Sequence, residues 1–271
     1  MALKQSIDFR DESNALYDVL KSTKDDLFNS QTQFKSWTIN DVLYHLHVWN
    51  NAAYLSLSDQ EEFTKFMKKF FNTIRAGCSA RAYEKELSNN ISGADLLAKW
   101  KEGFEKVSDK FSEADPKKRV KWAGPDMSVR SSITARLMET WSHGQEIYDQ
   151  LGIIRKDDDR IKNIVIMGIN TFGWTYKNRS IEVPKDQPKL ILESPTSEKW
   201  EWNTQNNDNS IIGSATEFCQ VVTQVRNIKD TSLRVRGDVA SMWMSIAQCF
   251  AGPPEDPPKK GSRFIKEKKN G

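Results

Sequence analysis

The sequence predicts an α+β protein in which an N-terminal four-helix bundle is followed by a small α+β domain. Apolar residues recur at helical spacing through the first half of the chain, whereas short β-prone segments alternate with helical patterns in the second half. The chain of 271 residues is also long enough for two domains. We place these domains at residues 1–152 and 160–254, and we expect residues 255–271 to form a basic, disordered tail.

Amphipathic segments account for the bundle in chain order, and residues typical of helix ends flank them. In the segment SWTIND, Thr38 is a good N-cap, and Asp41 can complete a variant of the capping box. Ser92 is the expected cap of a later helix, and Gly77 and Gly152 follow the ends of two others. The expected helical segments are residues 16–28, 38–58, 59–77, 92–111 and 128–151.

The second half begins with the charged segment IIRKDDDRIK, which we expect to be an exposed connector that holds the domain boundary near residues 153–159. A helical pattern follows around residues 164–172. The segments PKLILESP and EKWEWNT are expected strands, separated by the turn-rich SPTS. SATEFCQVVTQVRN is an expected helix, SLRVRGD a strand, and VASMWMSIAQCFAG a last helix that ends before PPEDPP, because proline cannot continue it.

Composition argues against several classes of protein. The net charge is +3, and the basic tail accounts for it, so the folded body is close to neutral and lacks the basic surface that nucleic acids need. Charged residues occur near the start of the sequence before any apolar run, unlike in a signal peptide. No apolar stretch is long enough to span a membrane. The three cysteines are widely separated and form no CxxC pair, which suits a reducing cytoplasm. GxGxxG, GxxxxGKS/T and GxSxG motifs are absent from the sequence.

The segment LMETWSHGQEIYD contains the residues best suited to chemistry. Glu139 and His143 are four residues apart, so both side chains project from one face of the helix expected there. His45, one of only three histidines, lies in the helix expected over residues 38–58, which can face the other helix across a bundle. These three residues predict a divalent metal site with positions left open for water or substrate. Zinc suits the ligands best, and nickel, iron or manganese also accept them.

The neighbouring residues have structural as well as functional interpretations. His47 lies about 200° around the helix from His45, so we expect only His45 to point into the site, on the face that it shares with Asp41. The alternative for His45 is a core histidine bonded to a backbone carbonyl. Asp41 is first a cap residue and second a hydrogen-bonding partner of His45. Glu146 is a surface acid, a fourth ligand or an acceptor that orients an imidazole.

One residue of the second half is a further candidate for the site. Arg226 could contact a substrate carboxylate, because a guanidinium group binds carboxylates through two parallel hydrogen bonds. The alternative is an arginine on the protein surface.

Three long blocks of the sequence resemble a known family. SWTINDVLYHLHVWNNAAYLSLSD, GPDMSVRSSITARLMETWSHGQEIYDQLGI and FCQVVTQVRNIKDTSLRVRGDVASMWMSIAQCFAGPP are similar to the mycothiol-dependent maleylpyruvate isomerase-like metal-binding proteins of the DinB-like superfamily. The C-terminal part is similar to a domain named for wyosine base formation. The resemblance implies a DinB-like four-helix bundle with a divalent metal, usually zinc, bound by His45, Glu139 and His143.

The resemblance also implies thiol-dependent chemistry on a small-molecule substrate. The characterised members of the group are an isomerase and transferases that join a low-molecular-weight thiol to an electrophile, and the metal lowers the pKa of that thiol. The sequence identifies neither the thiol nor the electrophile, and it leaves the catalytic residues and the oligomeric state open. The alternative to an isomerase or S-transferase is a non-catalytic, metal-stabilised helical sensor or interaction module. A third function, linked to RNA, is disfavoured by the nearly neutral body.

Overall fold

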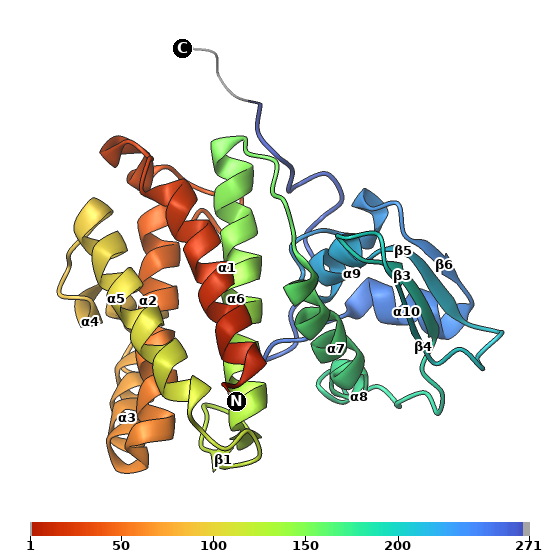
Figure 1. Ribbon diagram of the computed structural model, residues 1–271, viewed down its shortest axis with the longest axis horizontal. Helices are drawn as coiled ribbons and strands as arrows, with labels where there is room; N and C mark the ends of the chain where they lie inside the picture. The colour runs from red at the N-terminus through yellow and green to blue at the C-terminus, as the bar shows by residue number, and fades with distance from the viewer. Residues whose placement is uncertain (1, 268–271) are drawn as a thin grey trace. The chain divides into compact units, whose positions relative to one another are not determined.

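The computed structural model describes residues 2–267, and the chain forms two compact units with their junction between Gln150 and Leu151. The first unit is helical, and the second combines helices with a four-stranded sheet (Figure 1). The predicted α+β class is therefore confirmed. The junction lies just before Gly152, where we expected the bundle domain to end. None of the described helices is both long and apolar enough to cross a membrane.

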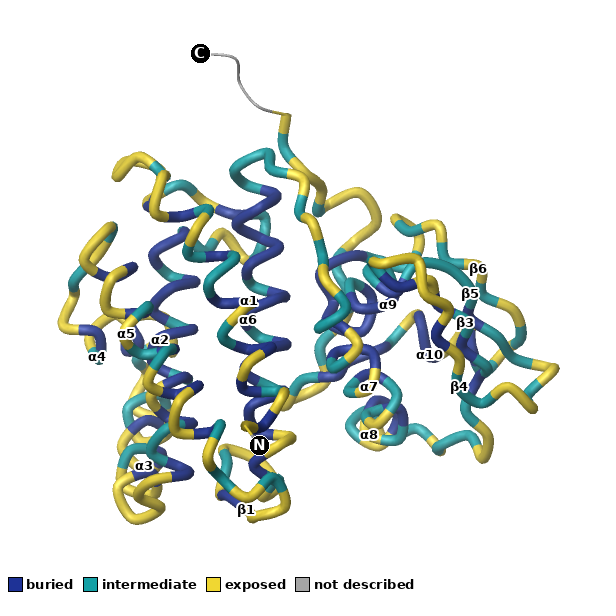
Figure 2. Tube along the Cα trace, in the orientation of Figure 1, coloured by how far each residue is buried: buried dark blue, intermediate teal, exposed yellow. Residues whose placement is uncertain are grey.

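Four long helices of the first unit lie side by side as a bundle, α1, α2, α5 and α6 (Figure 1). Helix α5 packs against both α1 and α2, and the bundle interior is filled by large apolar side chains such as Trp100, Phe104 and Trp141. Figure 2 shows long buried stretches on α2 and α6. The helices of this unit are α1 (Lys4–Leu20), α2 (Ile39–Ser58), α3 (Gln60–Arg75), α4 (Ala80–Leu87), α5 (Gly93–Ser112) and α6 (Val129–Leu151), with the 3-10 turn η1 (Asp25–Asn29) and the short strands β1 (Arg119–Val120) and β2 (Met127–Ser128).

The beginning of α2 is fixed by the capping box that the sequence predicts. The Thr38 Oγ1 atom accepts a hydrogen bond from the backbone N–H of Asp41 (3.1 Å), and the Asp41 carboxylate accepts one from the backbone N–H of Thr38 (2.9 Å). Both bonds satisfy N–H groups that a helix N-terminus otherwise leaves unpaired. The cap sets where the helix starts, and it therefore sets the face on which His45 projects, two turns further on.

The short helix α4 was not predicted, and it supplies a residue of the site. Ser79 caps it by accepting a hydrogen bond from the backbone N–H of Ala82 (3.2 Å). Tyr83 and Glu84 are buried, and α4 packs against α2 and α3. The segment has only eight residues, which is shorter than the stretch over which helical periodicity can be recognised in a sequence.

The second unit contains a mixed sheet in the order β4-β3-β5-β6. Strands β3 and β5 are parallel, and the other two pairings are antiparallel. Leu190, Leu192 and Ile211 project from the sheet into a core that also contains Phe218 and Trp243. Strand β5 was not predicted. The elements are η2 (Asp159–Ile161), α7 (Lys162–Asn170), α8 (Phe172–Lys177), β3 (Lys189–Glu193), β4 (Lys199–Trp202), β5 (Ser210–Ser214), α9 (Ala215–Val222), η3 (Ile228–Asp230), β6 (Arg234–Arg236) and α10 (Asp238–Ile246).

The charged connector is less exposed than the sequence suggested. The Arg155 and Asp157 side chains are only 5% and 6% exposed and form an ion pair at 3.2 Å. The Asp157 carboxylate also accepts a hydrogen bond from Thr216 Oγ1 (2.7 Å). A run of charges can therefore be buried when its members pair with one another and with nearby polar groups.

The first part of the expected disordered tail is also ordered, which corrects that expectation for residues 255–263. The Gln224 amide donates to the carbonyl oxygen of Glu255 (2.7 Å), and the Asn227 amide donates to that of Pro258 (2.8 Å). Arg179 forms an ion pair with Asp256 (2.8 Å). Proline-rich backbone is stiff and presents free carbonyl oxygens, so side-chain amides can bind it at a small cost in entropy. The last expected tail residues, 268–271, lie outside the described part of the chain.

Candidate metal centre

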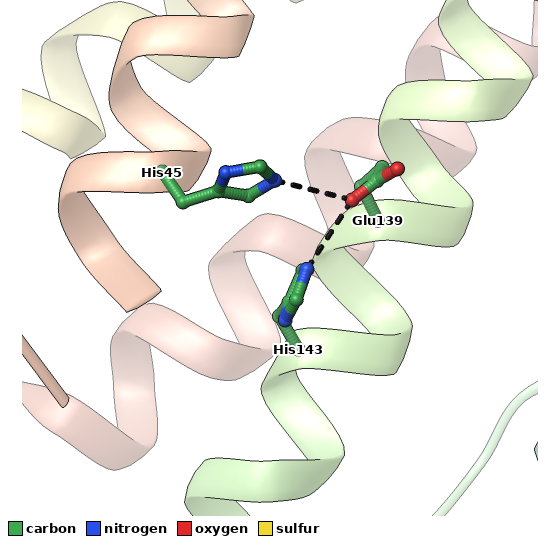
Figure 3. A group of neighbouring side chains, drawn as sticks. All are labelled: His45, Glu139 and His143. Carbon is green, nitrogen blue, oxygen red and sulfur yellow. Dashed lines mark hydrogen bonds and ion pairs between the residues drawn. The ribbon is translucent and has the colours of Figure 1, made fainter. Parts of the chain in front are cut away.

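The structure brings together the three residues that the sequence singled out as metal ligands (Figure 3). His45 projects from α2, and Glu139 and His143 project from successive turns of α6. The Glu139 Oε2 atom lies 3.4 Å from His45 Nε2 and 3.3 Å from His143 Nε2. One ligand atom from each residue lies within 4.8 Å of the other two. Two segments far apart in sequence thus converge on one point.

Two of the three separations between these ligand atoms fit a bound cation. With metal–ligand bonds of about 2.0–2.2 Å, neighbouring ligands of a tetrahedral zinc ion lie about 3.3–3.6 Å apart. Both measured separations, 3.3 and 3.4 Å, fall in that range. The side chains of His45, Glu139 and His143 are 18%, 22% and 12% exposed, so the cluster is sheltered but accessible from solvent.

The orientation of the His45 ring is set by a carboxylate that sequence reasoning missed. The Nδ1 atom of His45 lies 3.0 Å from the Oε1 atom of Glu84, on α4. An ionised carboxylate only accepts hydrogen bonds, so Nδ1 carries the hydrogen. Nε2 faces the Glu139 carboxylate at 3.4 Å, so it also carries a hydrogen when no metal is bound, and a bound cation would take the place of that hydrogen. The backbone-carbonyl alternative for His45 is wrong, because both ring nitrogens face carboxylates.

The electrostatics of the cluster favour a positive charge at its centre. Burial lowers the pKa of His45, but the Glu84 and Glu139 carboxylates outweigh it and raise this pKa to about 9. Burial raises the pKa of Glu139, but hydrogen bonds from His143 and His45 outweigh this and hold it well below its usual value. Burial lowers the pKa of His143, although its hydrogen bond with Glu139 opposes the shift. Without a metal, a proton on His45 therefore supplies the cation that the two carboxylates require.

A buried arginine lies beside the cluster. Arg136 is on α6, one turn before Glu139, and is only 2% exposed. Its Nε–H donates a hydrogen bond to the side-chain oxygen of Asn50 on α2 (3.2 Å). Its positive charge interacts with both Glu139 and Glu84. The site thus contains fixed charges of both signs.

A tight turn before α2 faces the cluster. The backbone N–H of Trp37 donates to the carbonyl of Phe34 (2.8 Å), which closes a four-residue turn. The central residues, Lys35 and Ser36, have φ angles of 49° and 56°. Left-handed backbone at two consecutive non-glycine residues is uncommon and costs free energy.

The aromatic residues of this turn contact the imidazoles. The Phe34 ring meets His143 edge to face at a centroid distance of 5.1 Å. The Trp37 ring lies 5.5 Å from that of His45 and 5.8 Å from that of His143. The ring of Trp49, one turn after His45, lies 6.2 Å from that of His45. The three-residue cluster therefore has an aromatic wall, formed by Phe34, Trp37 and Trp49.

Asp41, His47 and Glu146 do not belong to this three-residue group. The Asp41 carboxylate caps α2, and Arg81 approaches it at 3.7 Å. His47 is buried and accepts a hydrogen bond from the Asn51 amide at Nε2 (3.1 Å), away from the three ligands as expected. Glu146 is buried on α6 and does not belong to the three-residue group, so its supporting role remains a prediction.

Arg226 lies just after α9 in the second unit, where it is 8% exposed and donates to the carbonyl of Val225 (3.2 Å). The alternative of a surface arginine is therefore wrong. Substrate contact by Arg226 remains a prediction.

Comparison with known proteins finds a matching family, a sequence relative and solved structures of similar fold. Residues 9–148, more than half of the chain, match the family described as the mycothiol maleylpyruvate isomerase N-terminal domain. An uncharacterized protein of Mycobacterium tuberculosis, found in two strains, is 29% identical over 250 residues, which cover 91% of this chain and 95% of the relative. Crystal structures of the mycothiol-dependent maleylpyruvate isomerase and of a mutant of it cover 80% of this chain and 87% of theirs, with TM-scores of 0.51 and 0.50 and identities of 14% and 13%.

The fold and the cluster together define a helical-bundle protein that presents two histidines and a glutamate on facing helices. At 13–14% identity the solved structures support the fold alone. The match over residues 9–148 goes further. The chain belongs to the mycothiol maleylpyruvate isomerase N-terminal domain family, which confirms the resemblance drawn from the sequence.

Proposed function

We propose that this protein is a metal-dependent isomerase or S-transferase in which His45, Glu139 and His143 bind a divalent cation, most simply zinc, that activates a low-molecular-weight thiol. One observation carries the proposal. Two imidazole nitrogens and a carboxylate oxygen converge within 4.8 Å at a partly exposed point of the bundle. Three protein ligands leave a coordination position for an exogenous molecule, as catalytic zinc sites do.

The charges around the cluster support an anionic ligand at that position. Glu84 and Arg136 carry opposite charges and offset each other, which leaves the single negative charge of Glu139. A divalent cation would turn this into one net positive charge. Buried charge is costly unless it is balanced, so the loaded site favours an anion such as a thiolate over a neutral ligand.

The chain's own residues would hold and shelter this ligand. A cation bound here would lower the pKa of a coordinated thiol, so that thiolate is available near neutral pH. Phe34 and Trp37 provide an apolar surface beside the imidazoles and keep water away from that side. The solved relative is named as mycothiol-dependent, which supports a thiol as the partner of this chain.

Elemental analysis and cobalt substitution test the proposal. Natively purified protein should contain about one divalent metal ion per chain, whereas the His45→Ala and His143→Ala variants should lose it and His47→Ala should keep it. Cobalt-loaded protein should gain a thiolate-to-cobalt charge-transfer band when a low-molecular-weight thiol is added. Equal metal content in wild type and both ligand variants would reject the site. A cobalt spectrum that no thiol changes would reject thiol activation and favour a closed, structural metal.

A further inference from the structure

The buried carboxylate of Glu84 links two helices of the first unit. It lies on α4 and is only 2% exposed. Its Oε1 atom is 3.0 Å from His45 Nδ1 and accepts a hydrogen bond from the indole N–H of Trp49 (2.8 Å). Both partners lie on α2, one turn apart, so one oxygen atom joins α4 to the helix that bears a proposed metal ligand.

This contact selects one arrangement of the His45 ring. The hydrogen on Nδ1 points at Glu84, and Nε2 points at Glu139 (3.4 Å). In a ring whose Nε2 binds a cation, only Nδ1 can carry the hydrogen, and the Glu84 oxygen is the group that accepts it. Histidines that bind metals characteristically donate their second N–H to a carboxylate or carbonyl, which fixes the ring and raises the basicity of the ligating nitrogen.

Packing holds Glu84 and its partner in place. The Trp49 ring lies 5.3 Å from that of Phe70 and 5.7 Å from that of Trp122. Tyr83, next to Glu84 on α4, is buried and packs its ring against the same Phe70 at 5.6 Å. Packed aromatic rings therefore hold the Glu84 carboxylate in place against His45.

We infer that Glu84 is a positioning residue that fixes the tautomer and orientation of His45 and thereby sets the metal affinity of the site, with Trp49 holding Glu84 in place. This inference rests on the proposed metal site. It gives helix α4, which supplies no metal ligand, a role in the site through Glu84.

Zinc affinity and NMR of the His45 ring test this role in the full chain. The Glu84→Gln variant keeps an oxygen that can accept from Nδ1 but loses the charge, so we expect about tenfold weaker zinc binding by chelator competition. Glu84→Ala loses both and should bind about 10–100-fold more weakly. In zinc-loaded, ¹⁵N-labelled protein, the His45 Nδ1–H should be protected from exchange in the wild type and in Glu84→Gln, and should exchange rapidly in Glu84→Ala.

The matched control is Glu86→Gln, on the exposed side of the same helix, which should bind zinc like the wild type. Circular dichroism and melting curves identify variants that do not fold, and the isosteric Glu84→Gln variant keeps the test valid if Glu84→Ala is one of them. Wild-type zinc affinity in Glu84→Gln would overturn this inference alone, and so would an unchanged Nδ1–H signal in a folded Glu84→Ala. A wild-type protein that does not bind zinc would instead overturn the proposed function.

Discussion

Removal of the divalent cation should lower the melting temperature by an amount that follows from the placement of its ligands. His45 and Glu139 are 94 residues apart in sequence, and they come together only in the folded bundle. The cation would therefore bind the native state and not the unfolded chain. Its contribution to the free energy of unfolding is then RT ln(1 + [M]/Kd), about 2.7 kcal/mol when the free metal is at a hundred times Kd.

This free energy converts to a measurable shift. For a protein of this size, 1 kcal/mol changes the melting temperature by roughly 2–4 °C, so the expected difference between chelated and zinc-loaded protein is about 5–11 °C. Each tenfold rise in free zinc above Kd should add about 1.4 kcal/mol, or about 3–6 °C. Calorimetric melting curves in buffers of fixed free zinc would measure how the melting temperature changes with each tenfold change in zinc.

Two variants make the measurement specific. His143→Ala should melt at the same temperature at all zinc concentrations below those that bind non-specifically, since it lacks a ligand. His47→Ala should start from a lower baseline, because His47 is buried, but should keep the wild-type slope. A wild-type melting temperature that does not respond to zinc, or a His143→Ala slope equal to that of the wild type, would refute the reasoning.

Three further predictions concern stability and reactivity. Thr38→Ala removes the side-chain cap of α2 and should cost about 1–2 kcal/mol of unfolding free energy, measured by urea denaturation. In native protein a disulfide-exchange reagent should modify the half-buried Cys78 readily, and should reach Cys219 and Cys249 only after unfolding, because both are buried and burial raises the pKa of the Cys219 thiol. Burial raises the pKa of Tyr176 to about 12. Stability from this group is present below pH 10 and is lost as the pH rises towards 12, and Tyr176→Phe should lack this loss in denaturation curves.

Each of these predictions has its own control. Ser58→Ala, at the other end of α2, removes an exposed hydroxyl without a capping role and should change stability by less than about 0.5 kcal/mol. If Thr38→Ala also changes the free energy of unfolding by less than about 0.5 kcal/mol, the capping box does not set the start of the helix. Rapid labelling of more than one thiol in folded protein would contradict the burial of Cys219 and Cys249. Parallel alkaline stability curves for wild type and Tyr176→Phe would contradict the shift of the Tyr176 pKa.

Local sequence signals predicted the parts of the fold that local interactions determine. The capping box at Thr38 and Asp41 involves residues three apart, and the structure contains it as expected. Helix α4 and strand β5 were missed, because α4 is too short for a periodic pattern and β5 is defined by pairing with β3 and β6. Register between strands depends on residues distant in sequence, which a single sequence does not reveal.

The candidate site was predicted to a similar extent. The i, i+4 pair Glu139 and His143 follows from helical geometry, and the scarcity of histidines singled out His45 as the third member. The structure brings the three together, whereas metal binding itself remains a prediction. Glu84 was missed because its contact with His45 joins α4 to α2, which only the tertiary fold brings together.

The turn formed by Phe34, Lys35, Ser36 and Trp37 offers a way to engineer the entrance of the site. Two consecutive left-handed residues with a closing hydrogen bond are typical of a type I′ turn, for which asparagine followed by glycine is the preferred pair. In this protein Lys35 and Ser36 occupy these two left-handed positions, so the backbone is strained next to the aromatic residues Phe34 and Trp37. Replacement of these two residues by asparagine and glycine should therefore raise the free energy of unfolding, and it would leave the Phe34 and Trp37 rings beside the imidazoles unchanged.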